Sequence, residues 1–467
     1  MDALRFALLL LAALVLPLLP WGQGLAHDVP RLVLCLLSTA WVGACLLSSD
    51  VPGLHLARAQ TWAWGLLLLG GASVAFSARP DVALRECGFA VAVAVILGCA
   101  AGIRPQRKES HDMALTQLLV AGVFAYAILE LLLIVSGLIL DRTLDYWRVF
   151  AGYVNPRFFN HVQTLLIPLL LGLLGWSAVR GLWRGLAAFA LVANAFFLLL
   201  LMGRATLLAL VVGLLLVLLW FGPAGRAYAR RFVLAFAAGG ALYLLIIELL
   251  PWLLGMEPVP AFRELGERGS IEARFYLWRI ALDMIAAHPW LGVGPMHYAN
   301  QFNGEAAHPH NIYLQIAAEY GLPFFLILIF VLLRWFWRMT QRLRQHLSQT
   351  PDALALGCWA GLVGALVDGA FSGNFVMPLS QLWILITVIL LLQRLPQEPL
   401  ADSGTTRPSR LRLALWRVGL TLLLLAQLYV LVGAWQEFRQ TPVRIQGAQE
   451  PVGATHYSPR FWQDGWF

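Results

Sequence analysis

Residues 203–221 read Gly203-Arg204 followed by the run ATLLALVVGLLLVLLWF, and this stretch decides the fold. A transmembrane helix needs roughly 20 apolar residues. Because a backbone in hydrocarbon must satisfy its own hydrogen bonds, only helices and closed barrels span a bilayer. The apolar residues here are continuous rather than alternating, which excludes a barrel strand. The stretch therefore predicts a membrane-spanning helix that follows a tight turn at Arg204.

Runs of this kind recur along the whole chain of 467 residues, of which 60% are apolar and only 12% charged. This composition excludes a soluble domain with an ordinary polar surface. We therefore expect an all-α polytopic membrane protein with about 12–13 transmembrane helices. The runs lie near 3–21, 31–48, 61–77, 87–103, 115–139, 160–178, 185–202, 205–221, 232–251, 311–333, 353–371, 378–393 and 412–434.

The first run resembles the apolar core of a secretory signal peptide. It ends in Leu19-Pro20-Trp21 without a small-residue cleavage site, and further runs follow. We therefore expect this run to remain in the mature protein as a helix.

The basic residues predict the orientation in the membrane. The net charge of +8 could indicate a nucleic-acid partner, but the basic residues lie in short loops between apolar runs, so we expect no such partner. If the helices alternate, the richest loops face one side, which the positive-inside rule makes cytoplasmic. We therefore expect a bacterial inner-membrane protein with its N-terminus inside and a tail, 435–467, in the periplasm. These loops hold Arg104, Arg107, Lys108, Arg180, Arg184, Arg226, Arg230, Arg231, Arg334, Arg338, Arg342, Arg344, Arg394, Arg407, Arg410 and Arg412.

One connection, 252–310, is too long to be a simple turn, and long loops in compact proteins tend to be functional. We expect an amphipathic helix over 272–287 that lies at the outer membrane surface, with apolar contacts from Phe275, Trp278, Ile280, Leu282 and Ile285. The predicted organisation is a bundle of about nine helices over 1–251, this periplasmic loop, further transmembrane helices over 311–434, and the tail 435–467.

Arginine and histidine on the predicted outer face are the candidates for chemistry. Arginine is always charged and presents a planar fork of donors that matches phosphate oxygens. Histidine exchanges a proton near neutral pH, so His310 could accept a proton from an attacking hydroxyl. Plainer interpretations stay open: Arg204 could snorkel, the arginines of the amphipathic helix could form its solvated face, and His310 could merely cap a helix, with His308 nearby. The outer-face set is Arg157, Arg204, Arg274, Arg279, His308 and His310.

Acidic residues inside apolar runs are candidates too, because charge in a membrane is costly. Asp368, near the outer end of its run, is a plausible partner that orients an arginine, while Glu130 and Glu248 could be structural. The histidines of the long loop form only a weak H-x-H signal, and no nucleotide-binding or common hydrolase motif is present. We therefore expect neither a metal nor a cofactor.

Several motifs together resemble the superfamily of O-antigen ligases and polymerases. They are Gly203-Arg204-Ala205, Ala273-Arg274-Phe-Tyr-Leu-Trp278, His288-Pro289-Trp-Leu-Gly292-Val-Gly294-Pro295 and His310-Asn311-Ile-Tyr-Leu-Gln315 with Glu319-Tyr-Gly321. The specific part covers roughly 200–325, and the rest matches in topology, which is similar to that of GT-C glycosyltransferases. The resemblance implies a multi-span enzyme that moves a glycan from undecaprenyl diphosphate to a hydroxyl on the periplasmic side. It further implies that Arg204 and Arg274 bind the diphosphate, that His310 assists the acceptor, and that no metal takes part.

The resemblance leaves the acceptor open. It is a Ser or Thr of a pilin-like protein in the O-oligosaccharyltransferases, the lipid A core in the ligases, and a growing glycan in the polymerases. Ligases of this kind have both termini inside, whereas the charges here place an aromatic tail, with Tyr457, Trp462 and Phe467, outside. We therefore favour a protein O-oligosaccharyltransferase, with a lipid A-core ligase as the alternative and a polymerase after it. A polyprenol-lipid flippase without chemistry would need polar residues throughout the membrane depth.

Overall fold

The computed structural model describes residues 2–19, 22–47, 59–102, 109–153, 155–260, 271–301, 303, 305–395 and 410–447. In these ranges the chain forms helices joined by turns and contains no strand. Seven of the described helices are long and apolar enough to cross a membrane, and further apolar helices are shorter. The predicted all-α polytopic membrane fold is therefore confirmed.

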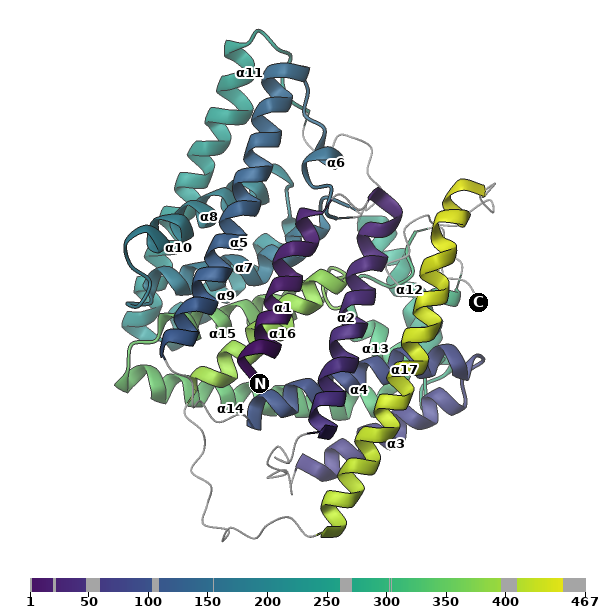
Figure 1. The fold of residues 1–467 in the computed structure, drawn as a ribbon. Coiled ribbons are helices and arrows are strands. Elements are labelled where there is room, and N and C mark those ends of the chain that lie inside the picture. Colours follow the sequence, from purple (N-terminus) through teal and green to yellow (C-terminus); the bar gives the residue numbers. More distant parts are fainter. Residues whose placement is uncertain are drawn as a thin grey trace. The chain divides into compact units, whose positions relative to one another are not determined.

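Each predicted apolar run coincides with a helix, as follows: α1 (Asp2–Val15), α2 (Gly22–Leu47), α3 (Ala59–Ala75), α4 (Pro80–Gly102), α5 (Glu109–Ser136), α7 (Phe158–Gly175), α8 (Gly181–Leu200), α9 (Arg204–Trp220), α10 (Gly222–Tyr243), α14 (Leu322–Gln349), α15 (Ala353–Asp368), α16 (Pro378–Arg394) and α17 (Arg410–Gly447) (Figure 1). Further helices lie between them: η1 (Leu16–Leu18), η2 (Gly137–Asp141), α6 (Tyr146–Val149), η3 (Leu244–Leu249), α11 (Leu250–Leu253), α12 (Ile271–Ala287), η5 (His297–Asn300) and α13 (Ile312–Tyr320).

Hydropathy predicts a single span over 311–333, but the structure has two helices there. Gly321, with φ +82°, separates α13 from α14, and α14 continues to Gln349. A Cβ atom at Gly321 would collide with the carbonyl of Trp290. Hydropathy does not detect this break, because the apolar residues continue across the glycine while the backbone changes direction there.

The chain divides into two compact units. Unit 1 comprises residues 1–27, 106–269 and 343–391, and unit 2 comprises 28–105, 270–342 and 392–467. In unit 1, α7 is buried along almost its whole length and packs against α15, which also packs against α9. Gly172 and Gly357 allow α7 and α15 to approach closely, because a Cβ atom at Gly357 would collide with the carbonyl of Pro168.

The helices of unit 1 place two sets of basic residues at opposite ends. At one end the Arg231 guanidinium donates to the carbonyl of Leu171, near the end of α7. The connection 176–180 and the start of α15 lie at this end too, because Gly172 of α7 is packed against Ala353. At the other end, α7 and α9 begin and α15 finishes. The basic loops of unit 1 are therefore separated from Arg204 by the length of the helices.

In unit 2, α12 packs against α13 through a small core of Leu277, Ala281, Tyr298 and Ala318. The helix predicted over 272–287 is confirmed, and Ile280 and Ile285 pack against this core as predicted, but the rest of the buried face differs from the prediction. Phe275 and Leu282 are exposed, whereas Leu277 and Ala281 are buried. The structure contains no membrane, and an exposed apolar side chain can face lipid as well as water.

Candidate functional site

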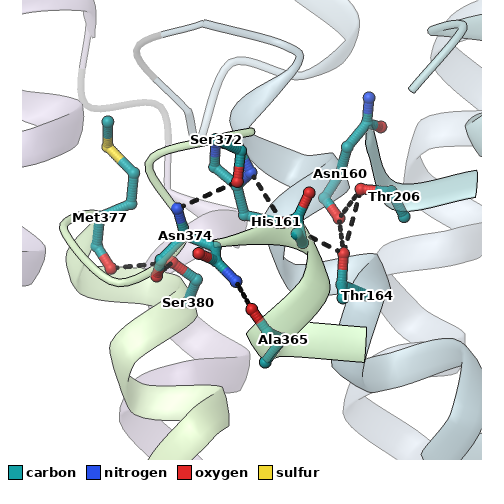
Figure 2. Close-up of polar contacts among 10 residues, drawn as sticks. Asn160, His161, Thr164, Thr206, Ala365, Ser372, Asn374, Met377 and Ser380 are labelled. Carbon is teal, nitrogen blue, oxygen red and sulfur yellow. Dashed lines mark hydrogen bonds and ion pairs between the residues drawn. The ribbon is translucent and has the colours of Figure 1, made fainter. Parts of the chain in front are cut away.

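The candidate residues fall in both units, and each group is described within its own unit. In unit 1 the first turns of α7 and α9 are held together by hydrogen bonds (Figure 2). The Thr206 hydroxyl donates to the carbonyl of Asn160 at 3.0 Å. The Thr164 hydroxyl lies 3.0 Å from the Thr206 hydroxyl and 3.1 Å from the same carbonyl. These contacts fix where α9 begins relative to α7.

Arg204 is the first residue of α9, and its side chain is exposed. The turn before it is tight, because Met202 has φ +51° and a Cβ atom at Gly203 would collide with the Asn160 amide. Within the described ranges the Arg204 guanidinium makes no hydrogen bond or ion pair. It is therefore a positive group at a helix N-terminus, where the backbone dipole adds further positive potential.

Arg157 lies at the N-cap position of α7, three residues before Asn160, and is half-buried. Its backbone N–H donates to the Asn155 amide oxygen at 2.9 Å. The bonds between Asn160 and Thr206 thus place the helix starts that carry Arg157 and Arg204 at the same end of unit 1.

Among the described residues, the Asp368 carboxylate contacts a histidine and a threonine and no arginine. Asp368 is the last residue of α15, fully buried, and its Oδ2 lies 3.5 Å from His161 Nδ1 and 3.5 Å from the Thr164 hydroxyl. The reason is that α15 packs along α7, so its final turn faces the first turns of that helix. His161 was missed from the sequence, although a histidine inside an apolar run is itself a signal.

The other two intramembrane acids differ from Asp368. Glu130 is buried within α5, and Glu248 is exposed on η3. Neither contacts the Asn160, Thr164, Thr206 and Asp368 cluster through any interaction found among the described residues.

In unit 2, His308 and His310 lie side by side before α13, with ring centroids 4.2 Å apart. The backbone N–H of His310 donates to Nδ1 of His308 at 3.1 Å, and His308 is buried. Because Nδ1 accepts this bond, it carries no proton, and a neutral His308 holds its proton on Nε2. His308 is thus a support for the backbone of His310.

His310 does not cap α13, because Asn311 does. The Asn311 side chain accepts hydrogen bonds from the backbone N–H groups of Tyr313 and Leu314, both at 3.1 Å. His310 has φ +51°, a left-handed conformation that is uncommon outside glycine and asparagine. Its half-buried ring therefore does not have the capping role.

Arg274 and Arg279 lie on α12, where Arg274 is half-buried and Arg279 exposed. Tyr298 fixes this helix to α13: its hydroxyl donates to the carbonyl of Leu277 at 3.0 Å, and its backbone N–H donates to Glu319 at 3.2 Å. Burial raises the pKa of Tyr298, which keeps its phenol protonated as a donor. This link between α12 and α13 could not be predicted from the sequence alone.

The loop between α12 and α13 is fixed to α13 by its backbone as well. The N–H groups of Val293 and Gly294 donate to the carbonyls of Ala318 and Glu319, both at 2.9 Å. Gly292 and Gly294 have positive φ values, so the quoted Gly-Val-Gly motif is needed for this close approach. In the ranges that the structure covers, no three His, Cys, Asp or Glu side chains are grouped as metal ligands.

These features define a multi-pass helical membrane protein whose candidate residues lie at the starts of α7 and α9, at the end of α15, on α12 and in the loop before α13. Residues 187–329 match the family model described as O-antigen ligase. The match agrees with the resemblance of the motifs in this part of the chain and supports a membrane glycan transferase of the O-antigen ligase type. The match includes Arg204, Arg274, Arg279, His308 and His310, and not Arg157 or Asp368. Comparison with curated proteins gives no match.

Proposed function

We propose that this protein transfers a glycan from undecaprenyl diphosphate to an acceptor hydroxyl on the periplasmic side of the bacterial inner membrane. The observation that carries the proposal is the exposed Arg204 at the start of α9, inside the matched region. An arginine in this position is costly in a membrane protein unless it meets water, an acid or an anionic ligand. Its guanidinium is exposed and has no acidic partner among the described residues, so it is available to bind an anionic ligand from solution.

The periplasmic orientation is supported by the charges at the two ends of unit 1. Arg180, Arg184 and Arg231 lie at the end opposite Arg204. Clusters of basic residues in short loops mark the cytoplasmic side. Arg204 would then act at the outer surface, where a lipid-linked glycan is presented.

In the proposed mechanism, Arg204 and Arg274 each bind phosphate oxygens of the donor, with Arg157 and Arg279 as further contacts. The acceptor hydroxyl attacks the anomeric carbon, the bond from that carbon to the diphosphate oxygen breaks, and the configuration inverts. His310 takes the proton of the hydroxyl, and the arginines stabilise the negative charge on the departing undecaprenyl diphosphate. The reaction needs no metal, because the arginines supply the positive charge.

For the acceptor we propose a Ser or Thr of a pilin-like protein. The argument is the expected periplasmic tail, of which α17 forms the part up to Gly447, while Tyr457, Trp462 and Phe467 lie outside the described residues. The alternative is the lipid A core, the acceptor that the name of the matched family suggests. A polymerase that extends a glycan is the third possibility.

The test uses purified full-length protein with undecaprenyl-diphosphate oligosaccharide and, in parallel, a pilin or lipid A core as the acceptor. Wild type should release undecaprenyl diphosphate and glycosylate one acceptor, whereas a flippase releases none. Arg204→Ala should lose transfer, because a charged contact contributes roughly 1.5–3 kcal/mol. Arg180→Ala, at the opposite end of unit 1, is the matched control and should transfer normally. Full activity of Arg204→Ala, or no release by wild type, would refute the proposal.

A further inference from the structure

A cluster of buried polar groups contacts the first turn of α9, which begins at Arg204, and has no role in the mechanism above. Thr164, Thr206 and Asp368 are buried almost completely, and Asn160 and His161 nearly so. Burying polar groups is costly unless they bond one another, and apolar residues of the same size would pack at least as well. A buried polar network is therefore a weak source of stability, and its clearest use is to specify one geometry.

The geometry that this network specifies is the start of α9. Thr206, two residues after Arg204, donates to the Asn160 carbonyl at 3.0 Å, and its hydroxyl also lies 3.0 Å from that of Thr164. Thr164 in turn lies 3.5 Å from Asp368, which faces His161 at 3.5 Å. The chain of contacts thus joins α15, α7 and α9 close to the first turn of α9. Figure 2 shows the contacts among Asn160, Thr164 and Thr206.

The turn itself leaves little freedom. Gly203 is packed so closely against the Asn160 side chain that a Cβ atom would collide with it. The Thr206 hydroxyl is thus the contact of α9 nearest to Arg204 that can hold the first turn in register.

We infer that the network of Asn160, His161, Thr164, Thr206 and Asp368 positions Arg204 to bind the diphosphate of the donor. Thr206 is its positioning residue on α9, and the pair of Asp368 and His161 supports it from α15. This inference rests on the proposed function, because it needs Arg204 to contact diphosphate. A side chain held in one place loses less freedom on binding, so the network would strengthen diphosphate binding without touching the ligand.

The experiment measures binding of undecaprenyl diphosphate to the purified full-length protein in detergent, which requires no knowledge of the glycan or acceptor. Thr206→Val removes the hydroxyl and keeps the shape, and we expect the Kd to rise on the order of tenfold. Thr206→Ser keeps the hydroxyl and should bind almost as wild type does. Thr387→Val is the matched control, because Thr387 is also buried in unit 1 but donates only to Trp383 of its own helix.

A double-mutant test with Arg204 distinguishes a positioning role of Thr206 from a purely structural one. In an Arg204→Ala background, Thr206→Val should weaken binding little further, because the group that it positions is gone. Equal weakening in both backgrounds, or an unchanged Kd for Thr206→Val while Arg204→Ala binds weakly, would overturn the inference. Unchanged binding by Arg204→Ala itself would instead refute the diphosphate role of Arg204. If Thr206→Val fails to insert, Asp368→Asn, which keeps the shape of its side chain, takes its place with the same expectations.

Discussion

His310 is the residue for which the structure makes the sharpest test, because Asn311 performs the capping role. His310→Asn should fold, since asparagine tolerates the left-handed backbone that His310 adopts. Asparagine cannot take up a proton, so transfer should fall about 10²–10⁴-fold, the usual effect of losing a general base, while donor binding stays normal. Turnover by purified protein checks this. His288→Asn, at an exposed histidine after α12, is the control and should retain activity.

Arg274 makes a second prediction at the scale of single residues. If its guanidinium binds phosphate oxygens as a fork, Arg274→Lys should restore only part of the transfer that Arg274→Ala loses, because lysine offers a point charge. The readout is the donor concentration for half-maximal transfer in each variant. Complete rescue by lysine would show that charge alone matters at this position, and full activity of Arg274→Ala would remove it from the site.

At the scale of elements, the join between α13 and α14 depends on Gly321. Gly321→Ala should lower the free energy of unfolding by about 1–3 kcal/mol and therefore lower the melting temperature in detergent. The reason is that a non-glycine residue is strained at positive φ and its Cβ meets the Trp290 carbonyl. Gly419→Ala on α17 is the control, since a Cβ atom there meets open space, and alanine favours a helix. Equal melting temperatures for Gly321→Ala and wild type would contradict the steric argument.

The sequence predicted elements better than contacts, and these residues show why. Hydropathy located the long apolar helices of the described residues, because burial in lipid depends on composition along a single stretch. It missed the break at Gly321, since the turn there depends on the contact with Trp290 and not on polarity. Asp368 was expected as a plausible partner that orients an arginine, whereas its carboxylate faces His161. That contact depends on which faces of α7 and α15 meet, and periodicity in one helix does not determine its neighbour.

The candidate site divides in the same way. Arg204 and His310 were selected as candidates because their residue types stand out at the edges of apolar runs and in the motifs that resemble the family. Thr206 and Tyr298 were not found, because a threonine in an apolar run and a tyrosine in a loop are common and gain a role only through partners distant in sequence. His308 was found for its chemistry, and the structure gives it a backbone contact to His310 instead.

For the whole molecule, the choice of acceptor depends on the side of the membrane on which the tail after α17 lies. The apolar part of α17 is Leu413–Gly433, preceded by a basic segment that the positive-inside rule places in the cytoplasm. The helix continues to Gly447 through a polar stretch, which would then project into the periplasm. Alkaline phosphatase fused after Gly447 should therefore be active, and green fluorescent protein fused there should be dark. A fusion after Arg394, in the preceding basic loop, is the control and should give the reverse pattern. An inactive phosphatase and a fluorescent green fluorescent protein after Gly447 would place the tail inside. That result would remove the main argument against a lipid A-core ligase and leave the proposed roles of Arg204 and His310 intact.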